Sequence, residues 1–172
     1  MVTRRLRIAV NAPVSYGGLV IHGGFKNGET VLVNAAAGGL GPVAVQMAKA
    51  IGAHVVATAS SEEKLDVAGR FGADEYVNYS NNEDWWQTVL ERTSGKGVDV
   101  VYDPVGLVDK NLKCLKQNGR ILLIGFAGRE GNMERIAMNR VLLRQAQIIG
   151  YVSLQANFRG RKASADDGSD LA

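Results

Sequence analysis

From Thr30 onward, short runs of β-branched and other apolar residues alternate with longer segments in which apolar residues recur every three or four positions. Runs of the first kind predict buried strands, and segments of the second kind predict amphipathic helices. We expect strands at 30–34, 55–59, 75–78, 98–103, 120–124 and 147–152. The intervening helices are expected at 40–51, 60–71, 83–93, 109–115 and 136–145.

Strands that alternate with helices of this length favour a parallel sheet with helices on both of its faces. Right-handed crossovers leave few topologies for such a sheet, and the natural strand order is 3-2-1-4-5-6. The sequence therefore predicts the α/β class and a Rossmann fold, that is, a doubly wound parallel six-stranded sheet.

The two ends of the chain depart from this alternation. Residues 1–29 contain good turn sequences but no full predicted element. Residues 153–172 are polar, mixed in charge and poor in core residues, so we expect them to be disordered. Within the alternating region, a capping box of Ser60 and Glu63 is expected to open the second helix, and Gly72 to end it.

The segment AAAGGLG, residues 35–41, joins the first predicted strand to the first predicted helix. It matches the dinucleotide-binding pattern G-x-G-x-x-G with Ala36 in place of the first glycine. Gly38 would let the backbone approach a pyrophosphate, and Gly41 would let the helix pack close to the strand. The helix N-terminus adds unpaired N–H groups and a partial positive charge, which favour an anion. A structural turn also needs glycine, but this placement favours nucleotide binding.

The end of the second predicted strand bears on which nucleotide is bound. An NAD site usually places Asp or Glu there, to hold the ribose hydroxyls. This chain has Ser60 and Ser61 instead, with Lys64 one helical turn later. Two hydroxyls and an ammonium group suit a 2′-phosphate. Lys64 is equally well explained as an ordinary solvated helix lysine, so the spacing favours NADP without deciding it.

Two further loops follow the fourth and fifth predicted strands. They are DPVG (residues 103–106) and GFAG (residues 125–128). Ligands of open parallel sheets bind at the carboxyl ends of the strands, so these loops would flank the nicotinamide end of a dinucleotide. Both sequences also fit simple strand-to-helix turns, which need glycine for backbone reasons.

Composition and charge exclude several classes of function. The chain has 172 residues, 46% of them hydrophobic, and a formal net charge of +3. No apolar run approaches a transmembrane length, and no basic stripe is interleaved with aromatic residues. We therefore expect one domain that binds neither a membrane nor nucleic acid.

The only cysteine, Cys114, excludes a disulfide framework and a cysteine zinc cluster. A reducing compartment fits best, and we expect a cytoplasmic protein. Mitochondrial targeting stays open as the weaker alternative, because no acidic residue precedes Glu29.

The chain has no Y-x-x-x-K pair, so the short-chain dehydrogenase mechanism is not available. His22 and His54 lack ligand-spaced partners, so we expect no metal site.

Four segments together resemble a known family. They are NGETVLVNAAAGGLGPVAVQMAKAIGAHVVATASSEEK, GADEYVNY, GKGVDVVYDPVG and NGRILLIGFAG. They look like the cofactor domain of the zinc-free medium-chain dehydrogenase/reductases, and most closely like the NADPH:quinone oxidoreductase (zeta-crystallin-like) branch. The resemblance covers residues 13–151, and its turn with alanine replacing the first glycine is usual in that branch.

The resemblance implies roles for matched positions, with NADP(H) as the cofactor. The residues implied at the adenosine 2′-phosphate are Ser60, Lys64 and Tyr79. Those implied at the pyrophosphate are Ala37, Gly38, Gly39 and Leu40. Those implied along the nicotinamide are Val105, Gly106, Gly125 and Phe126. No residue of this segment is expected to be catalytic, because the family chemistry depends on holding the nicotinamide against the acceptor.

The family implies hydride transfer from NADPH to a small-molecule acceptor, a quinone or a conjugated carbonyl compound. It also implies a homodimer joined edge to edge through Gln147 to Val152, a long apolar edge. One alternative is an NADPH-binding module without catalysis. A different Rossmann enzyme, such as a methyltransferase, is disfavoured because serines, not an acidic residue, stand directly after the second strand and Lys64 follows them.

The chain also departs from the family pattern. Members carry a substrate-binding domain before this segment and return to it afterwards, and here almost all of it is absent. We expect residues 1–24 to be a remnant of the connecting and substrate-domain segment, 25–152 the dinucleotide-binding domain, and 153–172 a disordered tail. The chain is therefore expected to be a fragment or the product of an imperfect gene model, which transcript sequencing across both ends would test.

Overall fold

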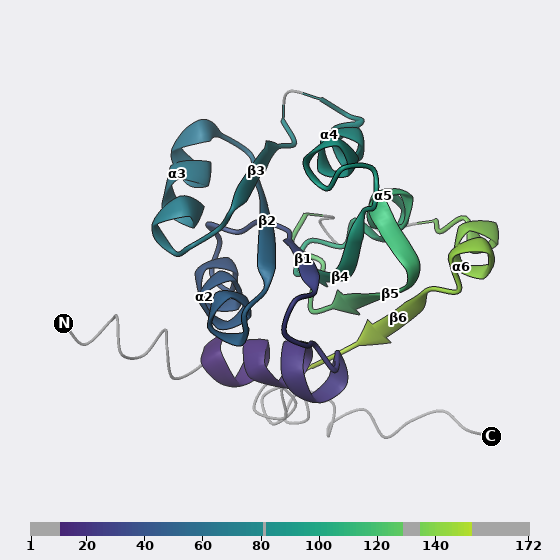
Figure 1. The fold of residues 1–172 in the computed structure, drawn as a ribbon, viewed down its shortest axis with the longest axis horizontal. Coiled ribbons are helices and arrows are strands. Elements are labelled where there is room, and N and C mark those ends of the chain that lie inside the picture. The colour runs from purple at the N-terminus through teal and green to yellow at the C-terminus, as the bar shows by residue number, and fades with distance from the viewer. Residues whose placement is uncertain (1–10, 81, 129–134, 153–172) are drawn as a thin grey trace, which may run out of the picture.

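The computed structural model of the chain describes residues 11–80, 82–128 and 135–152. Six parallel strands form one sheet in the order β3-β2-β1-β4-β5-β6 (Figure 1). The strands are β1 (Thr30–Val33), β2 (His54–Ala59), β3 (Glu75–Asn78), β4 (Val98–Asp103), β5 (Leu115–Leu123) and β6 (Gln147–Gly150). The predicted fold class and strand order are confirmed.

Helices connect these strands and cover both faces of the sheet. They are α2 (Gly41–Ile51), α3 (Glu62–Arg70), α4 (Trp85–Arg92), α5 (Val108–Cys114) and α6 (Met138–Arg144). Helices α2 and α3 pack on one face, and α4, α5 and α6 pack on the other. Each lies within the region where the hydrophobic pattern predicts a helix, apart from one residue at the start of α5.

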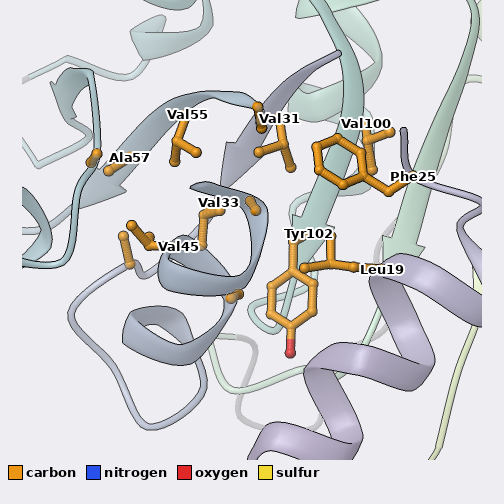
Figure 2. Close-up of a cluster of buried hydrophobic side chains, with 14 of the residues drawn as sticks. Leu19, Phe25, Val31, Val33, Val45, Val55, Ala57, Val100 and Tyr102 are labelled. Atoms are coloured by element: carbon orange, nitrogen blue, oxygen red, sulfur yellow. The ribbon is translucent and has the colours of Figure 1, made fainter. Parts of the chain in front are cut away.

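The hydrophobic core consists of two clusters, one on each face of the sheet. On β1, the side chains of Val31 and Val33 belong to one cluster, and that of Leu32 belongs to the other. Figure 2 shows the first cluster, in which valines of neighbouring strands face Val45 of α2. Successive strand side chains point to opposite faces, and both faces of a parallel sheet are covered. This is why β1 reads as a continuous apolar run.

The N-terminal part of the described chain is helical. Residues 11–16 form an α-helix, which continues as the π-helix η1 (Gly17–His22). The expectation that residues 1–29 hold no full element is therefore wrong. Glycine has a low helix propensity, and contacts distant in the sequence have outweighed it here.

Those contacts are made with the sheet. Leu19 is fully buried in the first cluster, beside Tyr102 of β4 (Figure 2). The hydroxyl oxygens of Ser15 and Tyr102 lie 3.2 Å apart, and burial raises the pKa of Tyr102 to about 12. A Cβ at Gly17 would lie 2.1 Å from the hydroxyl oxygen of Tyr151, so this close approach needs glycine.

Strand β5 begins earlier than the sequence predicts. Its pairing with β4 starts at Leu115, opposite Val98, and resumes at Arg120, opposite Val100. Within this irregularity, Asn118 adopts a φ of +59°. The start of the strand is set by its pairing with β4, which the local pattern does not reveal.

The N-terminus of α3 differs by one residue from the predicted capping box. Ser61, not Ser60, is the N-cap residue: its backbone is extended and its Oγ accepts a hydrogen bond from the Lys64 N–H at 3.4 Å. The predicted cap at Ser60 is therefore wrong. A hydrogen bond with the Ser61 side chain lowers the pKa of the Glu63 carboxyl. The helix ends at Arg70, before Gly72 with its φ of +101°, close to the predicted end.

We predict that Leu19→Ala lowers the free energy of unfolding by about 2 to 5 kcal/mol, because it leaves a cavity in a fully buried position. Urea unfolding followed by circular dichroism measures the change. Ile21→Ala is the matched control, since Ile21 lies in the same helix with 64% of its surface exposed. Equal effects of the two substitutions would contradict the packing of η1 on the sheet.

We also predict that Ser61→Ala lowers the free energy of unfolding by about 0.5 to 2 kcal/mol, through loss of the helix cap. Ser60→Ala should change it by less than about 0.5 kcal/mol, because Ser60 caps no helix. The same urea titration compares both variants with the parent chain. A larger effect at Ser60 would contradict Ser61 as the N-cap residue and would indicate that Ser60 caps the helix.

Candidate cofactor site

The candidate site lies at the carboxyl edge of the sheet, where the loops after β1, β2, β4 and β5 come together. Parallel strands all end at the same edge, so loops that are distant in the sequence become neighbours. Two adjoining hollows occupy this edge and share Ala35 and Gly38 in their walls. We call them the polar hollow and the apolar hollow.

The polar hollow lies between the turn after β1 and the start of α3, with a volume of about 90 Å³. Its lining residues are Ala35, Ala37, Gly38, Ala59, Ser60, Lys64 and Tyr79. The Lys64 Nζ donates a hydrogen bond to Ser60 Oγ at 2.7 Å. The Ser80 hydroxyl donates to the backbone oxygen of Ser60 at 2.9 Å, which ties the ends of β2 and β3 together. An ammonium and a hydroxyl group therefore converge on one small hollow.

The acidic residues near the polar hollow have other partners. Asn78 donates a hydrogen bond from its Nδ2 to Glu62 Oε1 at 2.9 Å. The Glu63 carboxyl interacts with Ser61 at the cap of α3. Neither glutamate lines the hollow, so the nearest charged group in its wall is the Lys64 ammonium. This distribution of charge favours an anion.

The apolar hollow continues the groove toward β4 and β5, with a volume of about 270 Å³. Its lining residues are Ala35, Gly38, Gly39, Leu40, Pro104, Val105, Ile124, Gly125, Phe126 and Ala127. Three backbone hydrogen bonds join its two outer loops: Ile124 N–H to Asp103 O, Ala127 N–H to Pro104 O, and Gly128 N–H to Val105 O. The loops after β4 and β5 therefore form one connected wall.

The turn after β1 is held tightly against its neighbours. Ala35 adopts a φ of +48°, a left-handed conformation that is unusual for alanine. The Ala36 N–H donates to Thr58 O at 2.9 Å, which fixes the turn to β2. A Cβ at Gly41 would lie 2.3 Å from Ala36 O, so this glycine lets the start of α2 lie close to the turn after β1.

A buried polar network lies beneath the site. The Thr58 hydroxyl donates to Asn34 Oδ1 at 3.0 Å, and Asn34 Nδ2 donates to Asn111 Oδ1 at 3.0 Å. Asn111 Nδ2 donates in turn to Asp103 Oδ2 at 2.8 Å. All four side chains are fully buried. This network was not predicted from the sequence, although Asn34 and Asp103 each follow directly on an apolar strand run.

The structure places nearly all of the predicted site residues along this groove. Those in the polar hollow are Ala37, Gly38, Ser60, Lys64 and Tyr79. Those in the apolar hollow are Gly38, Gly39, Leu40, Val105, Gly125 and Phe126. Gly106 lines neither hollow: it is buried, and its N–H donates to Asp103 Oδ1 at 2.9 Å. Five lining residues were not singled out from the sequence: Ala35, Ala59, Pro104, Ile124 and Ala127. Three of them, Ala35, Pro104 and Ala127, lie within the predicted loop segments, whereas Ala59 and Ile124 lie outside those segments.

Other reactive groups lie away from the groove. Cys114 is fully buried in α5, and this burial raises the pKa of its thiol to about 12. Among the residues that the structure describes, no three His, Cys, Asp or Glu side chains are grouped as metal ligands, so none is assigned to zinc. Across the same residues, no helix combines the length and the apolar character needed to cross a bilayer.

The chain is similar to several oxidoreductases in sequence. It is 44% identical over 104 residues to a 2-haloacrylate reductase of a Burkholderia species, a match that covers 59% of this chain and 31% of the relative. It is 35% identical over 142 residues to a probable quinone oxidoreductase of Schizosaccharomyces pombe, covering 78% of this chain and 42% of the relative. The chain therefore spans less than half the length of these curated relatives.

A solved structure and a family profile agree with these relatives. The quinone oxidoreductase of Thermus thermophilus, whose structures include a complex with NADPH, superposes with a TM-score of 0.72 at 31% identity. That match covers 90% of this chain and 48% of the solved one. The profile of the zinc-binding dehydrogenase family matches residues 39–163. The chain thus belongs to the zinc-binding dehydrogenases, within the medium-chain dehydrogenase/reductase superfamily, and resembles its quinone oxidoreductases.

Proposed function

We propose that the chain binds NADPH along the groove and belongs to an oxidoreductase that reduces a quinone or a conjugated carbonyl compound. The observation that carries the proposal is the pairing of the Lys64 ammonium with the Ser60 hydroxyl in the polar hollow, without a carboxylate in its wall. Those donors fit a 2′-phosphate, and they distinguish NADPH from NADH.

The other parts of the groove fit the rest of the nucleotide. Apart from Gly39 and its two chain neighbours, no heavy atom lies within 4 Å of the position that a Cβ would occupy at Gly39, so the turn leaves open space there. The backbone N–H groups at the start of α2 favour a pyrophosphate there. The apolar hollow, with Val105 and Phe126 in its wall, fits the nicotinamide ring and its ribose. The bound nucleotide would supply a hydride to the acceptor.

The proposed role of the protein residues is to bind and orient. The walls of the apolar hollow would hold the nicotinamide in one position and exclude water from one side of it. The acceptor class is proposed from the relatives, which are named for a quinone and for a 2-haloacrylate. Both compounds contain a carbon–carbon double bond conjugated to a carbonyl or carboxyl carbon. None of the described residues is assigned a catalytic role.

The proposal includes a homodimer joined through β6. Within the described residues, β6 pairs only with β5, so its outer edge can accept another strand. The stretch Gln147 to Val152 is partly apolar at this edge, where Ile148 is 36% and Val152 61% exposed. Edge-to-edge pairing of two copies would extend the sheet across both chains.

The first test is titration with NADPH and NADH, followed by nicotinamide fluorescence. NADPH should bind the parent chain at least about tenfold more tightly than NADH, because only NADPH carries the 2′-phosphate. Lys64→Ala should remove most of this preference by weakening NADPH binding alone. Equal affinity of the parent chain for the two nucleotides would contradict the assignment of the polar hollow.

Lys96→Ala is the matched control for this titration. Lys96 is an exposed lysine just before β4, at the opposite edge of the sheet from the groove. Its removal changes the net charge by the same amount as Lys64→Ala but touches no residue of the hollows. The NADPH preference should therefore stay within about twofold of the parent value.

A second test separates an active reductase from a binding module without catalysis. Purified protein is mixed with NADPH and a series of quinones, and the loss of absorbance at the nicotinamide band is followed. Turnover that falls with Lys64→Ala supports the reductase. NADPH binding without turnover of any acceptor would support the binding module, in which the groove holds the nucleotide and reduces nothing.

A further inference from the structure

The carboxylate of Asp103 is fully buried at the end of β4 and accepts four hydrogen bonds. Its Oδ1 accepts from the N–H groups of Val105 and Gly106, both at 2.9 Å. Its Oδ2 accepts from the Leu107 N–H at 2.7 Å and from Asn111 Nδ2 at 2.8 Å. A single side chain therefore fixes three successive backbone N–H groups of the loop that follows it.

That loop forms part of the wall of the apolar hollow. Pro104 and Val105 line the hollow directly. Their backbone oxygens also accept hydrogen bonds from Ala127 and Gly128, at 3.1 and 3.2 Å. The position of the loop after β5 therefore depends on the loop after β4, and both depend on Asp103.

Asn111 connects this carboxylate to the rest of the buried network. Its Nδ2 donates to Asp103, and its Oδ1 accepts from Asn34, which directly precedes the turn after β1. Asn111 thus helps to fix the orientation of the Asp103 side chain, at the same oxygen that accepts from the Leu107 N–H. A buried network in which each member is hydrogen-bonded is rigid, and removing one partner leaves another unsatisfied.

We infer that Asp103, oriented by Asn111, is a positioning residue that shapes the nicotinamide half of the groove. The inference rests on the proposed binding of NADPH. Asp103 lines neither hollow. It would therefore act on the nucleotide only through the loop whose N–H groups it binds. The polar hollow has no wall residue from this loop, so its ligand should be insensitive to Asp103.

The test compares two ligands that differ in the half of the groove they reach. Adenosine 2′,5′-bisphosphate reaches only the polar hollow, whereas NADPH reaches both hollows. Calorimetric titration gives the dissociation constant of each ligand for the full chain and for Asp103→Asn. The substitution replaces one carboxylate oxygen with an amide group, which then faces N–H donors.

Asp103→Asn should weaken NADPH binding by about tenfold or more, since two of the four hydrogen bonds to the side chain are lost whichever oxygen the amide nitrogen replaces. Binding of adenosine 2′,5′-bisphosphate should stay within about twofold. Cys114→Ala is the control, because it removes a buried side chain of α5 that lines neither hollow. Its ratio of the two dissociation constants should equal that of the parent chain.

Hydrogen exchange of the parent chain provides a second measurement that needs no variant. NADPH should increase protection at residues 105–107 and 127–128, and adenosine 2′,5′-bisphosphate should not. An absence of added protection with NADPH would overturn the inference, even if Asp103→Asn fails to fold.

The remaining outcomes separate the inference from the proposed function. If the parent chain binds both ligands but Asp103→Asn weakens both equally, or neither, then Asp103 is only structural and the proposed NADPH site stands. If Cys114→Ala shifts the ratio as much as Asp103→Asn does, the positioning role is likewise overturned. If the parent chain binds neither ligand, the proposed function fails and the inference fails with it.

Discussion

The parallel pairing of β1 between β2 and β4 is the constraint on which the rest of the structure depends. It buries β1 on both faces and along both edges, and it brings the ends of three strands to one place. The turn after β1, the serines after β2 and the loop after β4 meet only because those strands share a direction. The pairing of β3 with β2 and of β5 with β4 then brings Tyr79, Gly125 and Phe126 to the same edge.

The groove consists of two different kinds of surface, one polar and one apolar. In the polar hollow, one ammonium and one hydroxyl group are held within 2.7 Å of each other, while the neighbouring Glu62 is hydrogen-bonded to Asn78. In the apolar hollow, selectivity by charge is absent, and the wall depends on backbone geometry. The charge of the polar hollow would therefore determine which nucleotide binds, and the shape of the apolar hollow would position the nicotinamide.

Much of the fold could be predicted from the sequence because its signals are local. Apolar runs such as that of β1 mark the strands, and the glycine turn at 35–41 marks the groove. Ser61 shows the limit of local patterns, because two adjacent serines offer equivalent caps and only the start of α3 distinguishes them. Gly38 was predictable from the glycine motif, whereas the spacing left Lys64 open and only the family resemblance placed it at the site.

Features that depend on distant contacts were not predictable in this way. The helical form of η1 depends on Tyr102 and Tyr151, and the early start of β5 depends on its pairing with Val98. The network through Asn34 and Asp103 joins residues from β2, β4, α5 and the turn after β1, and no spacing along the chain indicates it. Tertiary structure decides such cases, because side-chain partners far apart in the sequence outweigh the local preference of the backbone.

The contact between η1 and the end of β6 has a consequence for the order of folding. During synthesis, residues 11–22 leave the ribosome well before Tyr151, the side chain against which Gly17 packs. The two glycines at the start of η1 give it little intrinsic tendency to remain helical in the meantime. Residues 11–22 are therefore synthesised before the rest of the described chain but are expected to be among the last to fold, packing onto a sheet that has already formed.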